Sequence, residues 1–185
     1  YVINDYFDVK IDAINKPKRV FIDRTIKRRS AMLMHQVLSA AGMLLGFYVA
    51  WYSGNFRLGF IHPIVAGLLW FYSTGYKRQM LVGNVIVAFL TALVVLLVAL
   101  YERHLFHPGN VAENAAAYTI FILVFFYFLF AFLISLVREL VKDMEDVEGD
   151  ERYGCKTLPV VLGVQRTKWI VYSICFLIIG FLIYI

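Results

Sequence analysis

The chain has 185 residues, of which 61% are hydrophobic and only 17% charged; its net charge is +5 and its mean hydropathy is +0.71. This composition excludes an ordinary water-soluble domain, in which about a quarter of the residues are charged. The charges are also clustered, because five long runs contain no Asp, Glu, Lys or Arg. Long runs without charge are typical of an integral membrane protein. The net positive charge does not by itself indicate a nucleic-acid partner.

The five charge-free runs predict five membrane-spanning helices. Each run is long enough, or nearly so, to cross a hydrocarbon core of roughly 30 Å at about 1.5 Å per residue. The first two runs are joined by a short turn around Gly54 and should pack as an antiparallel hairpin. In chain order, we expect the spans at Met32–Tyr52, Leu58–Tyr76, Val82–Tyr101, Tyr118–Leu140 and Trp169–Ile185.

Lys and Arg are distributed unevenly between the segments that flank these spans. Residues 1–29, 77–78 and 138–168 would lie on one side of the membrane and hold sixteen basic residues. Arg57 and residues 102–113 would lie on the other side and hold two. The positive-inside rule places the first side in the cytoplasm. We therefore expect a multi-pass protein of the cell inner membrane, in contact with membrane lipids, whose chemistry faces the cytoplasm.

Two acidic motifs of identical spacing lie on this side, about 130 residues apart in sequence. Both read D-x2-D-x3-D, which places three carboxylates on one face of a helix. Such carboxylates repel one another unless a cation lies between them, and Mg²⁺ prefers oxygen ligands and shares itself with substrate phosphates. A hydrated, fraying helix end explains either motif alone; the matched pair favours a diphosphate site. The candidate Mg²⁺ ligands are Asp5, Asp8, Asp12, Asp143, Asp146 and Asp150.

Basic side chains near the two motifs are candidates for binding the diphosphate. Arg grips phosphate as a fork, and Lys acts as a point charge. Positive-inside bias predicts basic residues at the same places without any chemistry, and for Lys77 and Arg138 the sequence leaves both explanations open. The candidates are Arg19, Lys77, Arg138 and Lys142.

The segments VINDYFDVKIDAINKP and RELVKDMEDVEGDERYGCKTLP resemble the UbiA superfamily of intramembrane prenyltransferases. They are similar in type to archaeal and bacterial members that resemble digeranylgeranylglyceryl phosphate synthases. The resemblance implies an all-α bundle of nine membrane helices. Residues 1–185 would form a single UbiA-like domain, truncated at both ends and holding about five full spans. It also implies that Asn4 belongs to the first motif and that Tyr72 and Lys77 correspond to a family Tyr and Lys that bind substrate.

This resemblance implies Mg²⁺-dependent transfer of a prenyl group from a prenyl diphosphate, such as geranylgeranyl diphosphate, to a lipid or aromatic acceptor. Mg²⁺ and basic side chains would stabilise the departing diphosphate. The allylic carbocation left behind must be shielded from water by the apolar interior. The candidate catalytic residues are Asp8, Asp12 and Asp146, and either of the first two could instead deprotonate the acceptor.

Two other classes of membrane protein compete with this interpretation. A cation-coupled transporter would place ionisable residues near the middle of the bilayer, whereas the five runs contain no Asp, Glu, Lys or Arg. A CDP-alcohol phosphotransferase also uses acidic metal ligands, but its signature begins D-G-x2-A-R, which this sequence lacks. Neither alternative accounts for two matched acidic motifs.

Overall fold

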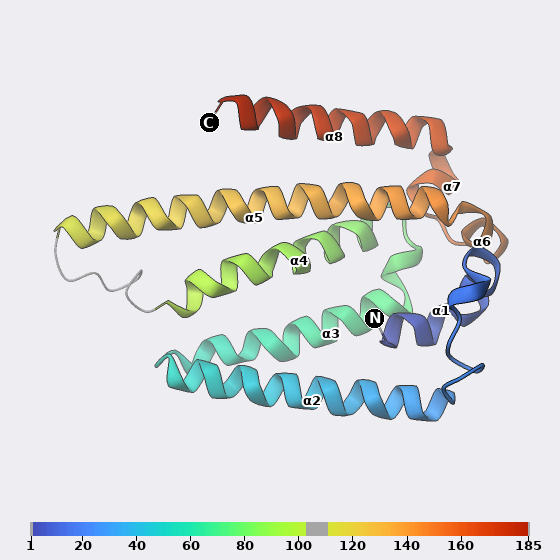
Figure 1. The fold of residues 1–185 in the computed structure, drawn as a ribbon, viewed down its shortest axis with the longest axis horizontal. Helices are drawn as coiled ribbons and strands as arrows, with labels where there is room; N and C mark the ends of the chain where they lie inside the picture. Colours follow the sequence, from blue (N-terminus) through green and yellow to red (C-terminus); the bar gives the residue numbers. More distant parts are fainter. Residues whose placement is uncertain (1, 103–110, 185) are drawn as a thin grey trace.

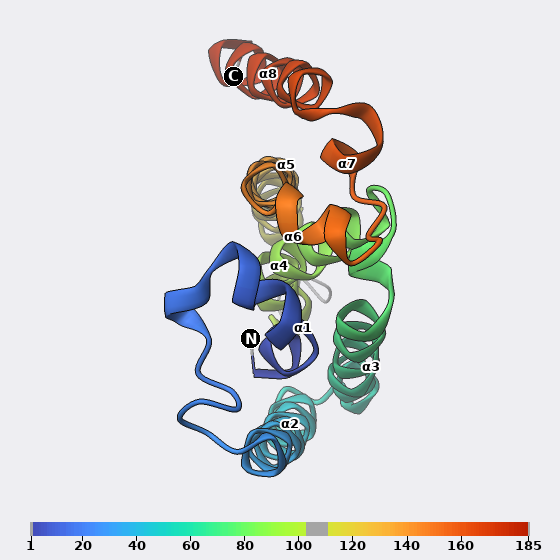
Figure 2. The ribbon, with the colours of Figure 1, turned by 90° about the vertical axis from the view of Figure 1, so that its right-hand side faces the viewer.

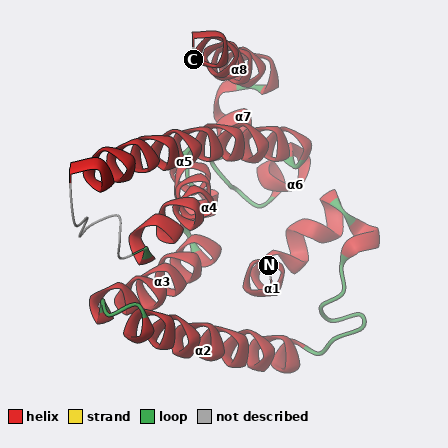
Figure 3. Cartoon of the chain, turned by 60° about the vertical axis from the view of Figure 1, so that its left-hand side comes forward, coloured by secondary structure: helices red, strands yellow, loops and turns green. Residues whose placement is uncertain are grey.

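The structure is a computed structural model that describes residues 2–102 and 111–184. In this part of the chain the regular elements are all helical, as Figure 3 shows, and the only β-pairing is an isolated bridge between Ile22 and Ile26. The α-helices are α1 Val2–Asn15, α2 Arg28–Tyr52, α3 Ile61–Thr74, α4 Val82–Tyr101, α5 Val111–Glu145, α6 Val147–Arg152, α7 Leu158–Leu162 and α8 Val164–Tyr184. The 3-10 helices are η1 Pro17–Arg19, η2 Phe56–Phe60 and η3 Tyr76–Arg78.

The five predicted spans are confirmed as helices long and apolar enough to cross a membrane. Large apolar side chains cover their outer faces, among them Leu44, Val98 and Phe176, which are each more than 70% exposed. In water such surfaces would aggregate, whereas in a bilayer they contact lipid. The chain is an all-α integral membrane protein. The segments that qualify are Arg28–Tyr52, Phe56–Thr74, Val82–Tyr101, Asn114–Glu145 and Val164–Ile183.

The short helices gather at one end of the long ones. Figure 1 shows α2, α3, α4, α5 and α8 running roughly side by side, with α1, α6 and α7 at the end where α5 finishes and α8 begins. Viewed from that end, α1 lies beside α3 and faces α6 (Figure 2). The two acidic motifs, which are far apart in sequence, are therefore carried to the same end of the bundle.

Two close contacts hold the opposite end of the bundle together. Gly46 on α2 leaves space for the ring of His62 on α3, because a Cβ at Gly46 would overlap that ring. The His62 Nε2 atom lies 2.9 Å from the Tyr101 hydroxyl at the end of α4, and the two rings stack. The α2–α3 pair is the predicted hairpin. Its turn uses Gly54 at φ +76°, a conformation that glycine adopts without strain.

The second acidic motif does not lie on one continuous helix. Helix α5 ends at Glu145, and the chain bends at Asp146 before α6 begins at Val147. Asp143 therefore belongs to α5 and Asp150 to α6, with Asp146 between them. The three aspartates of this motif therefore do not share the one helix face that their spacing predicted. The bend between α5 and α6 sets the position of Asp146.

Candidate active site

The first motif lies on α1, which is anchored by its apolar face. Ile3 and Ile11 are buried on this helix, and Asp8 between them is only 9% exposed. Burial of those isoleucines fixes the rotation of α1, so its aspartates face the ends of α3 and α5. Asp5, Asp8 and Asp12 thus lie on one continuous helix, as their spacing predicted.

All six aspartates line one cavity of about 320 Å³. Its walls come from α1, from η3 and from the α5–α6 bend, so that the two motifs face each other across it. The other charged, amide and hydroxyl side chains in these walls are Asn4, Lys16, Tyr72, Lys77, Arg78 and Lys142. The sequence prediction that both motifs form one site agrees with this arrangement, while the role of each residue stays a prediction.

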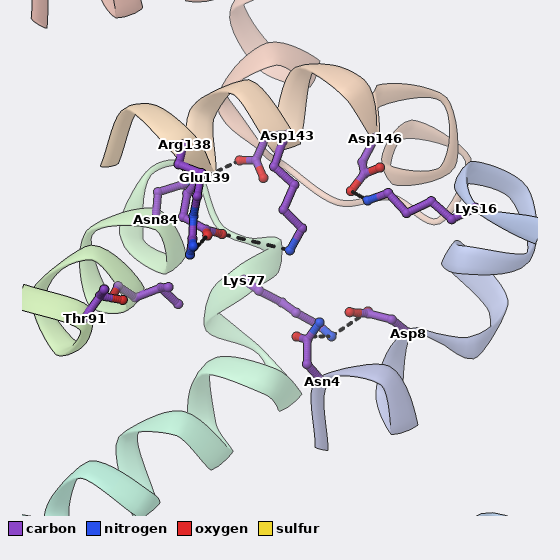
Figure 4. Close-up of polar contacts among 12 residues, drawn as sticks. Asn4, Asp8, Lys16, Lys77, Asn84, Thr91, Arg138, Glu139, Asp143 and Asp146 are labelled. Atoms are coloured by element: carbon purple, nitrogen blue, oxygen red, sulfur yellow. Dashed lines mark hydrogen bonds and ion pairs between the residues drawn. The ribbon is translucent and has the colours of Figure 1, made fainter. Parts of the chain in front are cut away.

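Lys77 extends from η3 to the first motif. Its Nζ atom donates to Asp8 Oδ1 at 2.5 Å and to Asn4 Oδ1 at 3.4 Å, as Figure 4 shows. The turn that carries Lys77 packs against Gly83 at the start of α4, where an added Cβ would lie 2.7 Å from the Lys77 Cα. The lysine side chain is 10% exposed. It is thus placed inside the cavity by close backbone packing and does not extend into solvent as an orientation signal alone would.

Lys16 forms the matching contact with the second motif, although sequence analysis did not select it. Its Nζ atom donates to Asp146 Oδ2 at 2.6 Å (Figure 4). The other oxygen, Asp146 Oδ1, is buried and has no hydrogen-bond partner among the described residues. The sequence feature that could have indicated Lys16 is its position four residues after Asp12, about one helical turn further along the same face.

Two further residues that the sequence did not single out orient the other two aspartates of the second motif. Asn84 Nδ2, from α4, donates to Asp143 Oδ2 at 2.8 Å, which is drawn in Figure 4. The Thr157 hydroxyl donates to Asp150 Oδ2 at 3.2 Å. Each of these aspartates is fixed by one neutral donor. Among the described residues, no hydrogen-bond donor is found for their second oxygens.

Arg138 is not brought into the acidic cavity. Arg138 donates to Glu139 at 2.8 Å, and its side chain is 58% exposed; it lines a second, neighbouring cavity. Arg19 lies in η1, and its side chain falls outside the described residues. Glu145, the last residue of α5, is exposed.

Burial and mutual repulsion make the acidic cavity a poor place for uncompensated negative charge. Burial, reinforced by the Asp8 carboxylate, raises the pKa of Asp12 to about 6. Burial also raises the pKa of Asp150 to about 6, with Asp146 adding to the effect against the opposing hydrogen bond from Thr157. Burial raises the pKa of Asp5 as well. Burial lowers the pKa of Lys77, and the Asp8 carboxylate opposes this shift only in part.

The donor set fits a hard divalent cation that is shared with a phosphate group. The ligands are carboxylate oxygens, and Asp146 supplies a buried one that lacks a protein donor. Within residues 2–102 and 111–184, no three Asp, Glu, His or Cys side chains already converge as an all-protein metal cage. Mg²⁺ usually binds through one or two carboxylates, with substrate phosphates and water filling its remaining positions. The arrangement on opposite walls of a cavity suits that mode.

We expect Mg²⁺ to stabilise the folded protein more at about pH 8 than at about pH 5. Because the pKa values of Asp12 and Asp150 are raised from 3.8 to about 6, ionisation weakens the metal-free fold as pH rises through that range. A cation offsets the repulsion but competes with protons for the same oxygens. The measurement is the melting temperature with and without saturating Mg²⁺ at both pH values. An equal Mg²⁺ effect at the two pH values would contradict this expectation.

The second cavity lies directly beside the first and is larger, at about 600 Å³. Asn4, Tyr72 and Lys142 line both cavities. From there it extends along α2 and α3 toward His62 at the opposite end of the bundle, between largely apolar walls. Its apolar lining includes Leu38, Met43, Val65, Ala66, Leu69 and Val87. A charged group in the first cavity and a long apolar group in the second could therefore belong to one ligand.

Known proteins are similar to this chain in sequence and in fold. The profile of the UbiA prenyltransferase family matches residues 1–185. The digeranylgeranylglyceryl phosphate synthase of Methanothermobacter thermautotrophicus is 37% identical over 164 residues, which cover 89% of this chain and 51% of the relative. The enzyme of the same name from Sulfurisphaera tokodaii is 36% identical over 180 residues, which cover 97% of this chain and 58% of the relative.

One solved structure has a similar fold. It comes from a study of digeranylgeranylglyceryl phosphate synthase in membranes and matches with a TM-score of 0.60 and 30% identity. The match covers 94% of this chain and 54% of that chain. The present chain thus spans about half the length of the relatives it matches. With the family profile covering the whole chain and both motifs at one cavity, the chain belongs to the UbiA prenyltransferase family.

Proposed function

We propose that the full-length protein transfers a prenyl group from a prenyl diphosphate to a hydrophobic acceptor. The observation that carries this proposal is that one cavity, lined by six aspartates, three lysines and an arginine, lies beside a larger, largely apolar cavity with which it shares lining residues. A prenyl diphosphate has the same division, with a highly charged head on a long apolar chain. The relatives named as digeranylgeranylglyceryl phosphate synthases support geranylgeranyl diphosphate as the donor.

The acidic cavity would bind the diphosphate together with Mg²⁺. Asp8 and Asp12 from one wall, with Asp146 and Asp150 from the other, are placed to hold the cation. When bound, Mg²⁺ supplies the Lewis-acid stabilisation that a departing diphosphate needs. Lys77 and Lys16 lie within reach of the same groups and would donate to phosphate oxygens, because a lysine ammonium is a compact donor for anions. Charge stabilisation of this kind acts most strongly in a site that excludes water.

The apolar cavity would hold the prenyl chain and protect the carbocation. Tyr72 lines both cavities, so it lies at the junction where the reacting carbon of the donor would sit. Apolar walls keep water from capturing the cation before the acceptor does. Arg138 and Lys142 line the same cavity and suit an acceptor with an anionic head, which agrees with the glyceryl phosphate in the relatives' name.

The orientation proposed for the site follows from the distribution of charge. Sixteen of the eighteen Lys and Arg residues belong to segments on the side of the two motifs. The positive-inside rule then places the acidic cavity on the cytoplasmic face of the cell's inner membrane. We further propose that residues 1–185 are part of one UbiA domain, with other membrane helices of the same domain completing the bundle.

The test is to incubate membrane vesicles containing the full-length protein with labelled geranylgeranyl diphosphate and a panel of acceptors. We expect Mg²⁺-dependent labelling of an isoprenyl glyceryl phosphate in preference to an aromatic acid such as 4-hydroxybenzoate. Because the donor is charged and does not cross membranes, inverted vesicles should react and sealed right-side-out vesicles should not. Absence of transfer to every acceptor by correctly inserted protein would refute the proposed activity, and reaction only in right-side-out vesicles would refute the orientation.

A further inference from the structure

Helix α6 begins in an unusual way. Its N-cap residue is Asp146, and aspartate at this position normally accepts a hydrogen bond from the backbone N–H of the second or third helical residue. Within the described residues, the Asp146 side chain makes no such bond. The third residue is Gly149, and its N–H donates instead to Oδ1 of Asn15 at 2.8 Å. Asn15 is the last residue of α1, 134 positions away in sequence.

The other half of the Asn15 amide makes the contact specific. Asn15 Nδ2 donates to the backbone carbonyl of Asp146 at 2.9 Å. The Asn15 amide therefore bonds to the backbone at Asp146 and at Gly149. The absence of a side chain at Gly149 makes room for the Asn15 amide, because an added Cβ would lie 2.5 Å from both Asn15 Nδ2 and Oδ1. The end of the first motif is thereby joined to the backbone of the second by two hydrogen bonds.

Because Asn15 accepts the hydrogen bond from the Gly149 N–H, the Asp146 carboxylate does not cap α6. Its Oδ2 accepts from Lys16 at 2.6 Å. Its Oδ1 is buried, and no described residue donates to it. Asp146 lines the acidic cavity, and neither of its oxygens is used to cap α6. An aspartate that capped α6 itself would turn at least one oxygen toward the Gly149 N–H and away from the cavity.

We propose that Asn15 is a positioning residue that caps α6 in place of Asp146 and so keeps the Asp146 carboxylate available to a cation–diphosphate complex. The role rests on the proposed function, since it serves the diphosphate site. Gly149 is its necessary counterpart. Neither residue touches the ligand; Asn15 acts through the backbone of the bend and through the rotamer of Asp146.

The proposal predicts a separation between folding and metal binding. In Asn15→Ala the Asp146 carboxylate can turn back and cap Gly149, so α6 keeps a capped N-terminus and the melting temperature should change little. The affinity for cation and diphosphate should fall about ten- to a hundredfold, as is typical when an outer-shell partner of a metal ligand is lost. Gly149→Ala, which removes the space for Asn15, should have the same effect. Glu148→Ala, at an exposed neighbouring position on α6, is the matched control and should bind normally.

The experiment is a double-variant cycle on the purified full-length protein, with binding of Mn²⁺ plus inorganic pyrophosphate as the readout. If Asn15 acts through Asp146, the double variant Asn15→Ala, Asp146→Ala should bind no more weakly than Asp146→Ala alone. Independent, additive losses of affinity, or wild-type affinity in both Asn15→Ala and Gly149→Ala, would overturn the positioning role. Wild-type protein that binds no Mn²⁺ and pyrophosphate would instead refute the diphosphate site itself, which makes the two failures distinguishable.

Discussion

Asp8→Ala and Asp146→Ala should each reduce prenyl transfer by at least about a thousandfold. Each change removes a carboxylate from one wall of the shared cavity and leaves a partly buried lysine, Lys77 or Lys16, without its carboxylate partner. A cation that needs oxygens from both walls then loses one of its carboxylate ligands, and its stabilisation of the leaving group is worth several kcal/mol. Steady-state kinetics with labelled donor measures the loss.

The combined variant should be scarcely worse than either single one. Residues that act as a unit give strongly non-additive losses, because removal of one member already disables the unit. Glu148→Ala, on the exposed side of α6, should keep most of the activity and controls for insertion and folding. Substantial turnover by folded Asp146→Ala protein would exclude the second motif from the chemistry.

Lys77→Ala should lower kcat/KM by about ten- to a hundredfold. A hydrogen bond to a charged group is worth roughly 1.5–3 kcal/mol, and each 1.4 kcal/mol is about tenfold in rate. A higher KM would indicate that the lysine binds the ground-state diphosphate, and a lower kcat that the contact strengthens as the leaving group departs. The measurement is steady-state kinetics at varied prenyl diphosphate concentration on purified, correctly inserted enzyme.

Lys10→Ala is the matched control for the charge itself. Lys10 is an exposed residue of α1 and does not line the acidic cavity, yet it contributes equally to the positive-inside bias. Its loss should leave the kinetics unchanged. If Lys77→Ala also has unchanged kcat/KM, then Lys77 serves only to orient the protein in the membrane, despite its contact with Asp8.

The spans and the first motif could be predicted from the sequence because both depend on local patterns. A charge-free run of about twenty residues has few alternatives to a membrane helix. Asp5, Asp8 and Asp12 lie on one helix, so their spacing alone places them on one face. The pairing of the two motifs was inferred from their matching spacing and position on one side of the membrane, and the structure brings both to one cavity.

The parts of the site that the sequence did not predict all depend on contacts between distant segments. Asn84 reaches Asp143 across 59 positions and Lys16 reaches Asp146 across 130, and no periodicity within either segment indicates such contacts. The bend at Asp146 breaks the helical spacing on which the second motif was interpreted. Arg138 was chosen because it is basic and lies close in sequence to Asp143, but a neighbouring carboxylate, Glu139, holds it beside the apolar cavity.

Helix α5 also couples the site to the thickness of the lipid bilayer. It has 35 residues, and at about 1.5 Å per residue its length of roughly 50 Å exceeds a hydrocarbon core of about 30 Å. Asp143 therefore lies near one end of a rod that must tilt when the bilayer becomes thinner. Asp8 lies on a different helix, α1. A change of tilt moves one wall of the cavity relative to the other, so lipid acyl-chain length should tune the distance between the two motifs.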